Sequence, residues 1–528
     1  MKKQVLGLLL CIFMIIVSSG CNKAETNDFT AASAGEEVSA KHSDNQAQKI
    51  ETVRLVTGVG SISKNIEGEN KTLINVTYPV VNLDYRDENK YPELFKALEA
   101  FNESEKERQL GFMAEYRDYA NETYEYQGES INAVKSIVKP YIRRADSLVT
   151  SILCTEYSYL GGYHGDFCYY GNNYNTKTGE IISLSEVVND YEKFAQAVFE
   201  KLSLYWEGIE PDNAQSIEKI LREEEAITWT LDYNGITVYF LPYSIASFVV
   251  GAPQVTVSYD EYPDIIQEKY KTTPDSYGVQ LVKNDSFYYD VTNDGKVDEI
   301  VFLAQEIGEG RDIGSVSISI NGETYEEESW FYNLNATFIH SKDGNNYIYI
   351  EYFREGEYIQ TVCYDISNGI KKTGEVDGSI CTSYSQYVDN AVTTAVLTNP
   401  ESFYLGKYTH ILSSVNGYKE YRTGDNGVPV TDDKWFRFDE KHVRTLTVLK
   451  DFDADVYDEN KDKITGKRTL HKGDKVVYVG TDGDKYGLLK CPDGTVCRVE
   501  YAFDDETYYI TVNGINIDEI FDGVIYGG

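Results

Sequence analysis

The sequence predicts an α+β protein: an α/β recognition module in which helices pack on an antiparallel sheet, followed by a β-rich middle region and a small SH3-like barrel. Three observations support this fold class. The chain is 13% aromatic, with 45 Tyr, and has 41 Gly but only 11 Pro, which favours strands joined by glycine turns. Helical spacing of apolar residues occurs mainly in the first half. The 528 residues leave room for several domains.

The first half of the chain supplies the elements of the recognition module. Apolar residues alternate over residues 51–88, which predicts strands. Residues 91–127 are predicted to be helical, because Pro92 suits a first turn and Leu94, Leu98 and Phe101 recur at helical spacing. A pair of strands follows, with its turn at Gly161-Gly162.

A second helix is predicted from about residue 184. Ser183 and Glu186 have the spacing of a capping box. The apolar stripe that follows is typical of a helix face in a core: Val187, Tyr191, Phe194, Val198, Leu202 and Tyr205. Further on, Asn234-Gly235 joins two strand-like stretches and is the strongest short hairpin signal in the chain.

The N-terminus predicts export and a lipid anchor. Two lysines precede an apolar run from Val5 to Val17, which is too short to span a membrane and fits a signal peptide. The next residues, Ser18 to Cys21, resemble a bacterial lipobox, although Ser18 stands where Leu is usual. An ordinary signal peptide is the alternative. We expect residues 1–21 to hold the signal peptide and lipobox, with Cys21 lipidated, and residues 22–50 to form a disordered tether.

The charge balance restricts the partners. The formal net charge is −37 at pH 7. Such a chain repels phosphate backbones and anionic lipid headgroups, so we expect no nucleic-acid partner and attachment to the membrane through the lipid anchor. The acidity favours a cationic partner. The predicted location is the outer face of the cytoplasmic membrane of a Gram-positive bacterium.

Six cysteines lie beyond Cys21 and form three pairs along the sequence: Cys154/Cys168, Cys363/Cys381 and Cys491/Cys497. An exported protein can form disulfides from such pairs. Three sets of reduced, buried thiols are the alternative. The absence of a C-x-x-C motif argues against a structural zinc site.

Two motifs give the first module a specific resemblance. Residues 161–165 read GGYHG and residues 242–251 read PYSIASFVVG. With the strands and the Leu-Ser-Glu helix between them, they make residues 51–270 similar to the extracellular lysozyme-binding module of the anti-sigma-V factor family. The same module accompanies a peptidoglycan deacetylase as a non-catalytic domain. The resemblance implies lysozyme as a candidate partner.

The resemblance also implies the ligand-binding residues: Tyr163, His164, Tyr243, Ser247 and Phe248. A structural role for His164 in its glycine-rich turn is the alternative. This chain departs from the family where a second Pro-Tyr is usual, because Ser247 and Phe248 stand there. It also has two valines, 249 and 250, in place of the usual Ala-Ala.

Residues 276–435 are predicted to form short strands, and they contain one candidate metal site. Asp290, Thr292, Asp294 and Asp298 occupy positions 1, 3, 5 and 9 of a calcium-type loop with Gly at position 6. Position 12 is Val301 instead of Glu, and a strand is expected to follow. Calcium is the only candidate cofactor; an Asp-rich hairpin turn without metal is the alternative.

Residues 440–528 are predicted to form the SH3-like barrel. The stretch LHKGDKV at residues 470–476 resembles the L-x-K-G-D-x-V turn of bacterial SH3-type barrels. Such modules often bind cell-wall peptide or glycan, which implies peptidoglycan as another candidate partner. A purely structural barrel is the alternative.

The sequence lacks an organised catalytic constellation. The six His are scattered, and neither H-E-x-x-H nor G-x-S-x-G is present. We therefore expect a non-enzymatic cell-surface lipoprotein that binds a protein or cell-wall ligand, with lysozyme or another cationic protein as the first candidate. A peptidoglycan-binding module is one alternative. A cell-wall hydrolase with an acidic pair is another, since such pairs have no fixed spacing.

Overall fold

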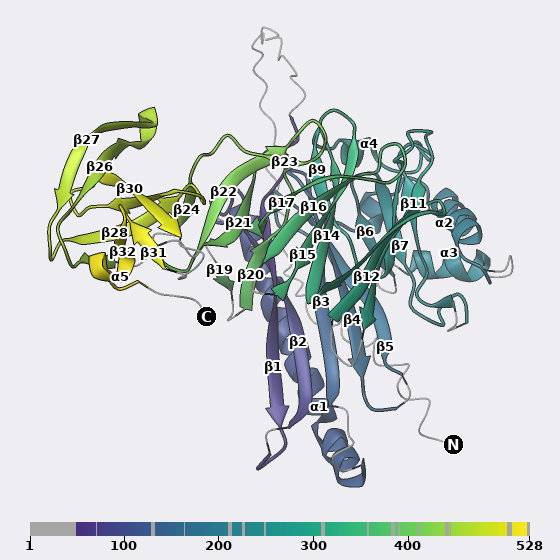
Figure 1. The fold of residues 1–528 in the computed structure, drawn as a ribbon. Helices are drawn as coiled ribbons and strands as arrows, with labels where there is room; N and C mark the ends of the chain where they lie inside the picture. Colours follow the sequence, from purple (N-terminus) through teal and green to yellow (C-terminus); the bar gives the residue numbers. More distant parts are fainter. Residues whose placement is uncertain are drawn as a thin grey trace, which may run out of the picture.

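The computed structural model is dominated by β-strands (Figure 1). Of the described residues, 51% are in strands and 16% in helices. The predicted fold class is therefore wrong: the first module is not an α/β unit with several packed helices, because one long helix and two shorter ones accompany many sheets. The structure describes residues 49–69, 71–127, 133–162, 164–209, 214–223, 227–247, 250–307, 312–355, 358–381, 386–388, 391–409, 412–438, 443, 445–503 and 509–524.

The predicted signal peptide, Cys21 and nearly all of the tether lie outside the described residues. Within the described part, no helix is long and apolar enough to cross a membrane.

A seven-stranded sheet is the first structural unit, in the order β19-β20-β1-β2-β3-β4-β5. Its strands are β1 (Leu55–Asn65), β2 (Thr72–Leu83), β3 (Val134–Ala145), β4 (Val149–Tyr159), β5 (Asp166–Asn175), β19 (Gln386–Val388) and β20 (Ala391–Ala395). The pair β2–β3 is parallel and the other pairs are antiparallel. Strand β20 pairs with β1 through Val56 and Ala395, so the sheet includes chain from the predicted middle region.

Helix α1 (Pro92–Gln127) makes the crossover between the parallel strands β2 and β3. Its residues Leu94, Leu98 and Phe101 are buried against the sheet, next to Leu83 and Val138. The predicted helix and its apolar face are thus confirmed. The predicted strand pair and its turn at Gly161-Gly162 are also confirmed, as β4 and β5.

A small three-stranded sheet with two helices forms the second unit. It contains β6 (Thr228–Leu231), β7 (Gly235–Tyr239), β8 (Gln254–Ser258), α2 (Tyr191–Tyr205) and α3 (Ala214–Arg222). The predicted helix start is wrong, because Leu184–Glu186 is a separate 3-10 turn and Ser183 makes no side-chain capping bond. Asp190 caps α2 instead, through the amides of Glu192 and Lys193.

The predicted core stripe and hairpin of this unit are confirmed. Phe194, Val198 and Leu202 of α2 are fully buried in one cluster with residues of β6, β7 and β8. The hairpin at Asn234-Gly235 joins β6 to β7. Helix α4 (Glu268–Lys271) follows β8.

Two sheets then form a β-sandwich. One is four-stranded, with β10 (Asp285–Tyr289), β11 (Asp298–Ile307), β12 (Asp312–Ile320) and β13 (Glu323–Phe331) in sequence order. The other is five-stranded and contains β9 (Tyr277–Gln280), β14 (Asn333–His340), β15 (Asn346–Phe353), β16 (Ile359–Asp365) and β17 (Lys371–Asp377). Phe302, Ile318, Phe338 and Ile350 are among the residues buried between the two sheets.

The last unit is a branched fourteen-stranded sheet, at the left of Figure 1. It contains β18 (Ser379–Cys381), β21 (Phe403–Thr409), β22 (Val415–Thr423), β23 (Pro429–Val430), β24 (Phe436–Phe438), β25 (Thr445–Val448), β26 (Phe452–Asp458), β27 (Lys463–Leu470), β28 (Lys475–Thr481), β29 (Tyr486–Lys490), β30 (Val496–Phe503), β31 (Ile510–Val512), β32 (Ile515–Asn516) and β33 (Phe521–Asp522). A 3-10 turn (Glu459–Lys461) and α5 (Ile517–Ile520) complete it.

A separate SH3-like barrel is not observed. Strand β24 pairs with β22 through Gly417 and Phe438, and with β28 through Phe436 and Thr481. Because β28 pairs with a strand from before residue 440, the C-terminal strands are part of a larger sheet.

None of the described cysteines beyond residue 150 forms a disulfide. The Sγ atoms of Cys491 and Cys497 lie 4.0 Å apart and both residues are buried beside the turn between β29 and β30. Burial raises the pKa of the Cys497 thiol to about 12.

The turn Asp232-Tyr233-Asn234, between β6 and β7, connects the small three-stranded sheet to three other sheets. Asp232 forms a buried ion pair with Arg143 of β3, with Nη2 and Oδ2 2.7 Å apart and side chains 5% and 2% exposed. The Tyr233 ring stacks on Tyr277 of β9, with centroids 3.9 Å apart. Asn234 Nδ2 donates to the backbone oxygen of Tyr288 in β10.

We predict that Asp232→Asn lowers the free energy of unfolding by about 3–5 kcal/mol, because it leaves the buried Arg143 guanidinium without a counter-charge. Urea denaturation measures this loss. Arg117→Ala is the control, since its exposed pair with Asp118 is expected to contribute less than about 1 kcal/mol. A loss below about 1 kcal/mol for Asp232→Asn would contradict the assigned role.

The buried carboxyl of Glu351 should make the free energy of unfolding depend on pH. Burial raises the pKa of this carboxyl from 4.5 to about 7, although the amide of Ile380 donates to its Oε1. Because the folded-state pKa lies above the unfolded value, the free energy of unfolding falls as the pH rises from 4.5 to about 7. Glu351→Gln should stabilise the protein by about 1–3 kcal/mol at about pH 8 and by much less at about pH 5. An equal effect at both pH values would contradict this prediction.

Candidate functional site

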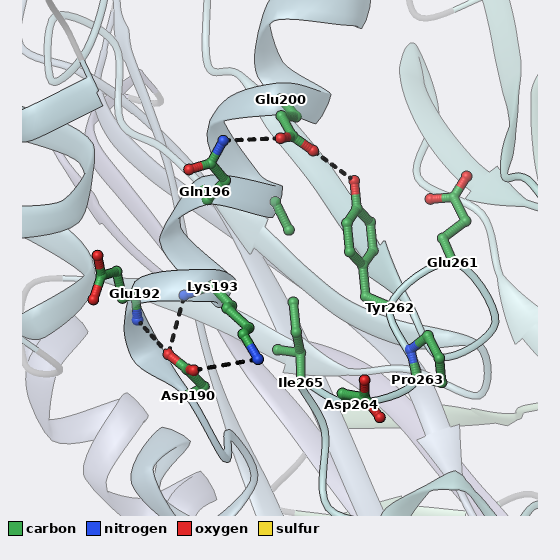
Figure 2. Close-up of a pocket in the computed structure, with 11 residues that line it drawn as sticks. Asp190, Glu192, Lys193, Gln196, Glu200, Glu261, Tyr262, Pro263, Asp264 and Ile265 are labelled. Carbon is green, nitrogen blue, oxygen red and sulfur yellow. Dashed lines mark hydrogen bonds and ion pairs between the residues drawn. The ribbon is translucent and has the colours of Figure 1, made fainter.

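An open acidic groove lies beside the first turns of α2. Its volume is about 670 Å³, and it runs between α2 and the segment after β8 (Figure 2). The lining residues are Asp190, Glu192, Lys193, Gln196, Ala197, Glu200, Glu261, Tyr262, Pro263, Asp264 and Ile265. Five of these lining residues carry a carboxylate, and only one of them is a lysine.

Local structure places these side chains. Once Asp190 caps α2, residues four apart share one helix face, which puts Glu192, Gln196 and Glu200 in a row. The opposite wall is formed by residues 261–265. The backbone amide of Asn189 holds this wall in place by donating to the backbone oxygen of Ile265 at 2.7 Å. The groove is therefore built into the fold of this unit.

Hydrogen bonds order the inner part of the groove. Gln196 Nε2 donates to Glu200 Oε1 at 3.0 Å, and the Tyr262 hydroxyl donates to Glu200 Oε2 at 3.3 Å. Burial, and then the charge of Glu200, raises the pKa of Tyr262 to about 12. Tyr262 is therefore a neutral hydrogen-bond donor at physiological pH.

Glu261 has a structural role at the edge of the groove. It forms an ion pair with the buried Lys201 of α2. Its Oε1 accepts a hydrogen bond from the amide of Val297, 3.1 Å away, just before β11. This carboxylate thus ties the groove to the β-sandwich, and its charge is compensated. Glu192, Glu200 and Asp264 remain as exposed carboxylates.

The groove can attract cationic groups, because carboxylates predominate in its lining. No His lines it. Across the described residues, no group of three or more His, Cys, Asp or Glu is arranged to hold a metal ion.

The predicted ligand-binding residues that the structure describes, His164, Tyr243 and Ser247, lie on loops outside this groove. His164 is exposed in the β4–β5 turn. Tyr243 and Ser247 are exposed on the loop after β7. Tyr163 and Phe248 lie outside the described residues. The two loops flank one aromatic cluster, because Phe167 of β5 and Ala252 both pack on a core of Leu153, Tyr169 and Tyr239.

Tyr243 has an unusual backbone conformation. Its φ is 69°, in the left-handed region, and its side chain is 58% exposed. A bulky residue in this region is strained by about 1–2 kcal/mol. Strained backbone conformations occur preferentially at active and ligand-binding sites.

The predicted calcium-type loop uses its oxygens internally. Asp290 accepts from the amides of Asp294 and Gly295, and Asp298 Oδ2 accepts from the amide and hydroxyl of Thr292. Asn321 Nδ2 donates to the other oxygen of Asp298. These hydrogen bonds give the loop the contacts of an Asx-type turn, and calcium binding by it stays a prediction.

The sequence interpretation missed the groove. Its helix wall has a signal in the sequence, since Glu192, Gln196 and Glu200 are spaced four apart beside an apolar stripe. The opposite wall has no such signal, because residues 261–265 reach α2 only through tertiary packing.

We predict that Tyr243→Gly leaves the free energy of unfolding unchanged or raises it slightly, because glycine adopts positive φ without strain. Tyr119→Gly is the control, an exposed position in α1 where glycine should cost about 1 kcal/mol. Urea denaturation compares the two variants. Equal destabilisation by both would show that Tyr243 is not strained.

Comparison with known proteins places one segment of the chain in a family. Residues 184–260 match the family described as "Protein of unknown function (DUF3298)". No curated protein matches the chain.

Two crystal structures of that family are similar. A DUF3298 family protein from Pseudomonas aeruginosa PAO1 is 14% identical with a TM-score of 0.27, covering 42% of this chain and 97% of that one. A member from Bacteroides fragilis NCTC 9343 is 16% identical with a TM-score of 0.29, covering 42% and 94%. The residues that match the DUF3298 family model, 184–260, are the segment that builds α2, α3, β6, β7 and β8, and the family is described as having unknown function.

Proposed function

We propose that this protein is a non-enzymatic cell-surface lipoprotein that binds a cationic protein through the acidic groove beside α2, with lysozyme as the first candidate. The observation that carries this proposal is the groove itself, where the exposed Glu192, Glu200 and Asp264 face solvent together. The groove is open to solvent, so a protruding basic side chain of a protein partner can enter it.

The resemblance of residues 51–270 to the lysozyme-binding module of the anti-sigma-V factor family supports the choice of partner. The motifs at 161–165 and 242–251 carry that resemblance. The exposed Tyr243 in the second motif, with its left-handed backbone conformation, offers an aromatic side chain to a partner on the loop after β7. The lipobox ending at Cys21 supports anchoring at the outer face of the cytoplasmic membrane.

Net charge adds a kinetic argument. At −37, the chain steers a basic protein toward it over a distance set by the salt concentration. The screening length is about 10 Å at 0.1 M salt, so only charges near the contact act strongly at physiological salt. Local carboxylates in the groove should therefore decide the affinity there.

The decisive variant neutralises the groove by Glu192→Gln, Glu200→Gln and Asp264→Asn together. We expect the variant to bind lysozyme about 10-fold or more weakly at physiological salt, because three carboxylates at the contact lose their charge. Calorimetric titration of the chain without its signal peptide measures the affinity. Asp190 and Glu261 stay unchanged because they hold the fold.

The matched control is Glu103→Gln, Glu115→Gln and Glu122→Gln, three exposed residues of α1. It removes the same total charge and should leave the affinity at physiological salt within about twofold. Equal weakening by both variants would mean that only net charge matters. No lysozyme binding at low or physiological salt would overturn lysozyme as the partner.

A further inference from the structure

The outer face of the four-stranded sheet is covered at β10, where Tyr205 of α2 packs on Tyr288, but it reaches solvent over β12 and β13. From Ser315 of β12 onward, and along β13, residues alternate between this outer face and the core; the ladder between the two strands shifts register between Ile313 and Ser315. Ser315, Ser317 and Ser319 of β12 lie on the outer face, and Glu326, Glu328 and Trp330 of β13 continue it. Strand β13 is also the edge of the sheet.

Hydroxyls and carboxylates lie side by side on this outer face. In the antiparallel register, Ser317 is opposite Glu326 and Ser315 is opposite Glu328. The two glutamates are exposed and form no ion pair with described residues. By contrast, Glu327 points to the other side and accepts from the Tyr364 hydroxyl. The outer face therefore presents uncompensated negative charge beside a column of short hydroxyl side chains.

Two exposed aromatic residues lie at the end of this row of serine side chains. Trp330 is 40% exposed and Tyr332 is 45% exposed. Their ring centroids are 4.5 Å apart at an interplanar angle of 66°, and Trp330 Nε1 donates to Asp312 Oδ2. The contact and the hydrogen bond hold the indole in place while it stays in water. Trp229 and Trp435, in contrast, are buried.

We propose that this outer face binds a polysaccharide whose sugars carry free amino groups. The apolar C–H face of a pyranose ring stacks on an indole ring, and sugar hydroxyls pair with the serine hydroxyls and the carboxylates. A protonated sugar amine adds charge complementarity with Glu326 and Glu328 and a cation–π contact with Trp330. The charge of the face thus favours an amino sugar over a neutral or acidic one.

This site is independent of the acidic groove. It lies on β12 and β13, and the groove lies on α2 and residues 261–265. Either site can therefore fail its test without affecting the other.

The test compares two probes: a glucosamine hexamer and an N-acetylglucosamine hexamer. Calorimetric titration of the chain without its signal peptide is done in mildly acidic buffer, where the sugar amines are protonated. We expect the glucosamine hexamer to bind about 10-fold more tightly, because only it carries ammonium groups. Equal affinity for both probes, or no binding of either, would overturn the proposal.

Three variants locate the site. Trp330→Ala should reduce the affinity for both hexamers about 10-fold or more, and Trp330→Phe should retain part of it. Glu326→Gln with Glu328→Gln should abolish the preference for glucosamine. Tyr358→Ala, at an exposed aromatic residue beside β16, is the control and should change neither affinity.

A hexalysine probe tests whether the outer face binds basic polypeptides instead of sugars. If hexalysine binds with the same dependence on Trp330 while neither hexamer binds, the outer face is a site for basic polypeptides and the proposal fails. Unchanged glucosamine binding in Trp330→Ala would also overturn it. Melting curves confirm that each variant is folded.

Discussion

The buried arginine pair at the end of β3 is the interaction on which the arrangement of the sheets depends. The ladder with β4 shifts register at this point, so the consecutive Arg143 and Arg144 both reach the interior. Arg143 pairs with Asp232, and Arg144 with Asp146 at 2.7 Å. Buried ions need both a counter-charge and further hydrogen bonds to offset their desolvation.

The surrounding chain supplies those hydrogen bonds. Arg144 donates to the backbone oxygens of Tyr270 and Thr272, and the Tyr259 hydroxyl lies 3.3 Å from its Nη1. These acceptors come from the end of the DUF3298 segment and the stretch after it. The seven-stranded sheet, the small sheet and the sandwich are thus fixed to each other by a few polar contacts that tolerate little displacement.

The acidic residues of the chain serve two different purposes. Some are paired and buried, as Asp232 and Glu261 are, and hold neighbouring units together. Others, such as Glu200 and Glu326, are exposed in places where side chains of like charge or exposed aromatic rings gather. Net charge alone does not separate these groups, because burial and partners decide whether a carboxylate is available to a ligand.

Local patterns in the sequence determined the elements whose causes are local. The apolar spacing of Leu94, Leu98 and Phe101 predicted α1, and Asn234-Gly235 predicted the β6–β7 hairpin. Only the tertiary structure decided which strands pair, because Val56 meets Ala395 across most of the chain and β24 joins the C-terminal strands to β22. The same holds for the sites: spacing placed Glu192 and Glu200 on one helix face, but the wall opposite them and the exposure of Trp330 depend on packing between distant segments. Periodicity records which side of an element is buried, and it carries no information about which element covers that side.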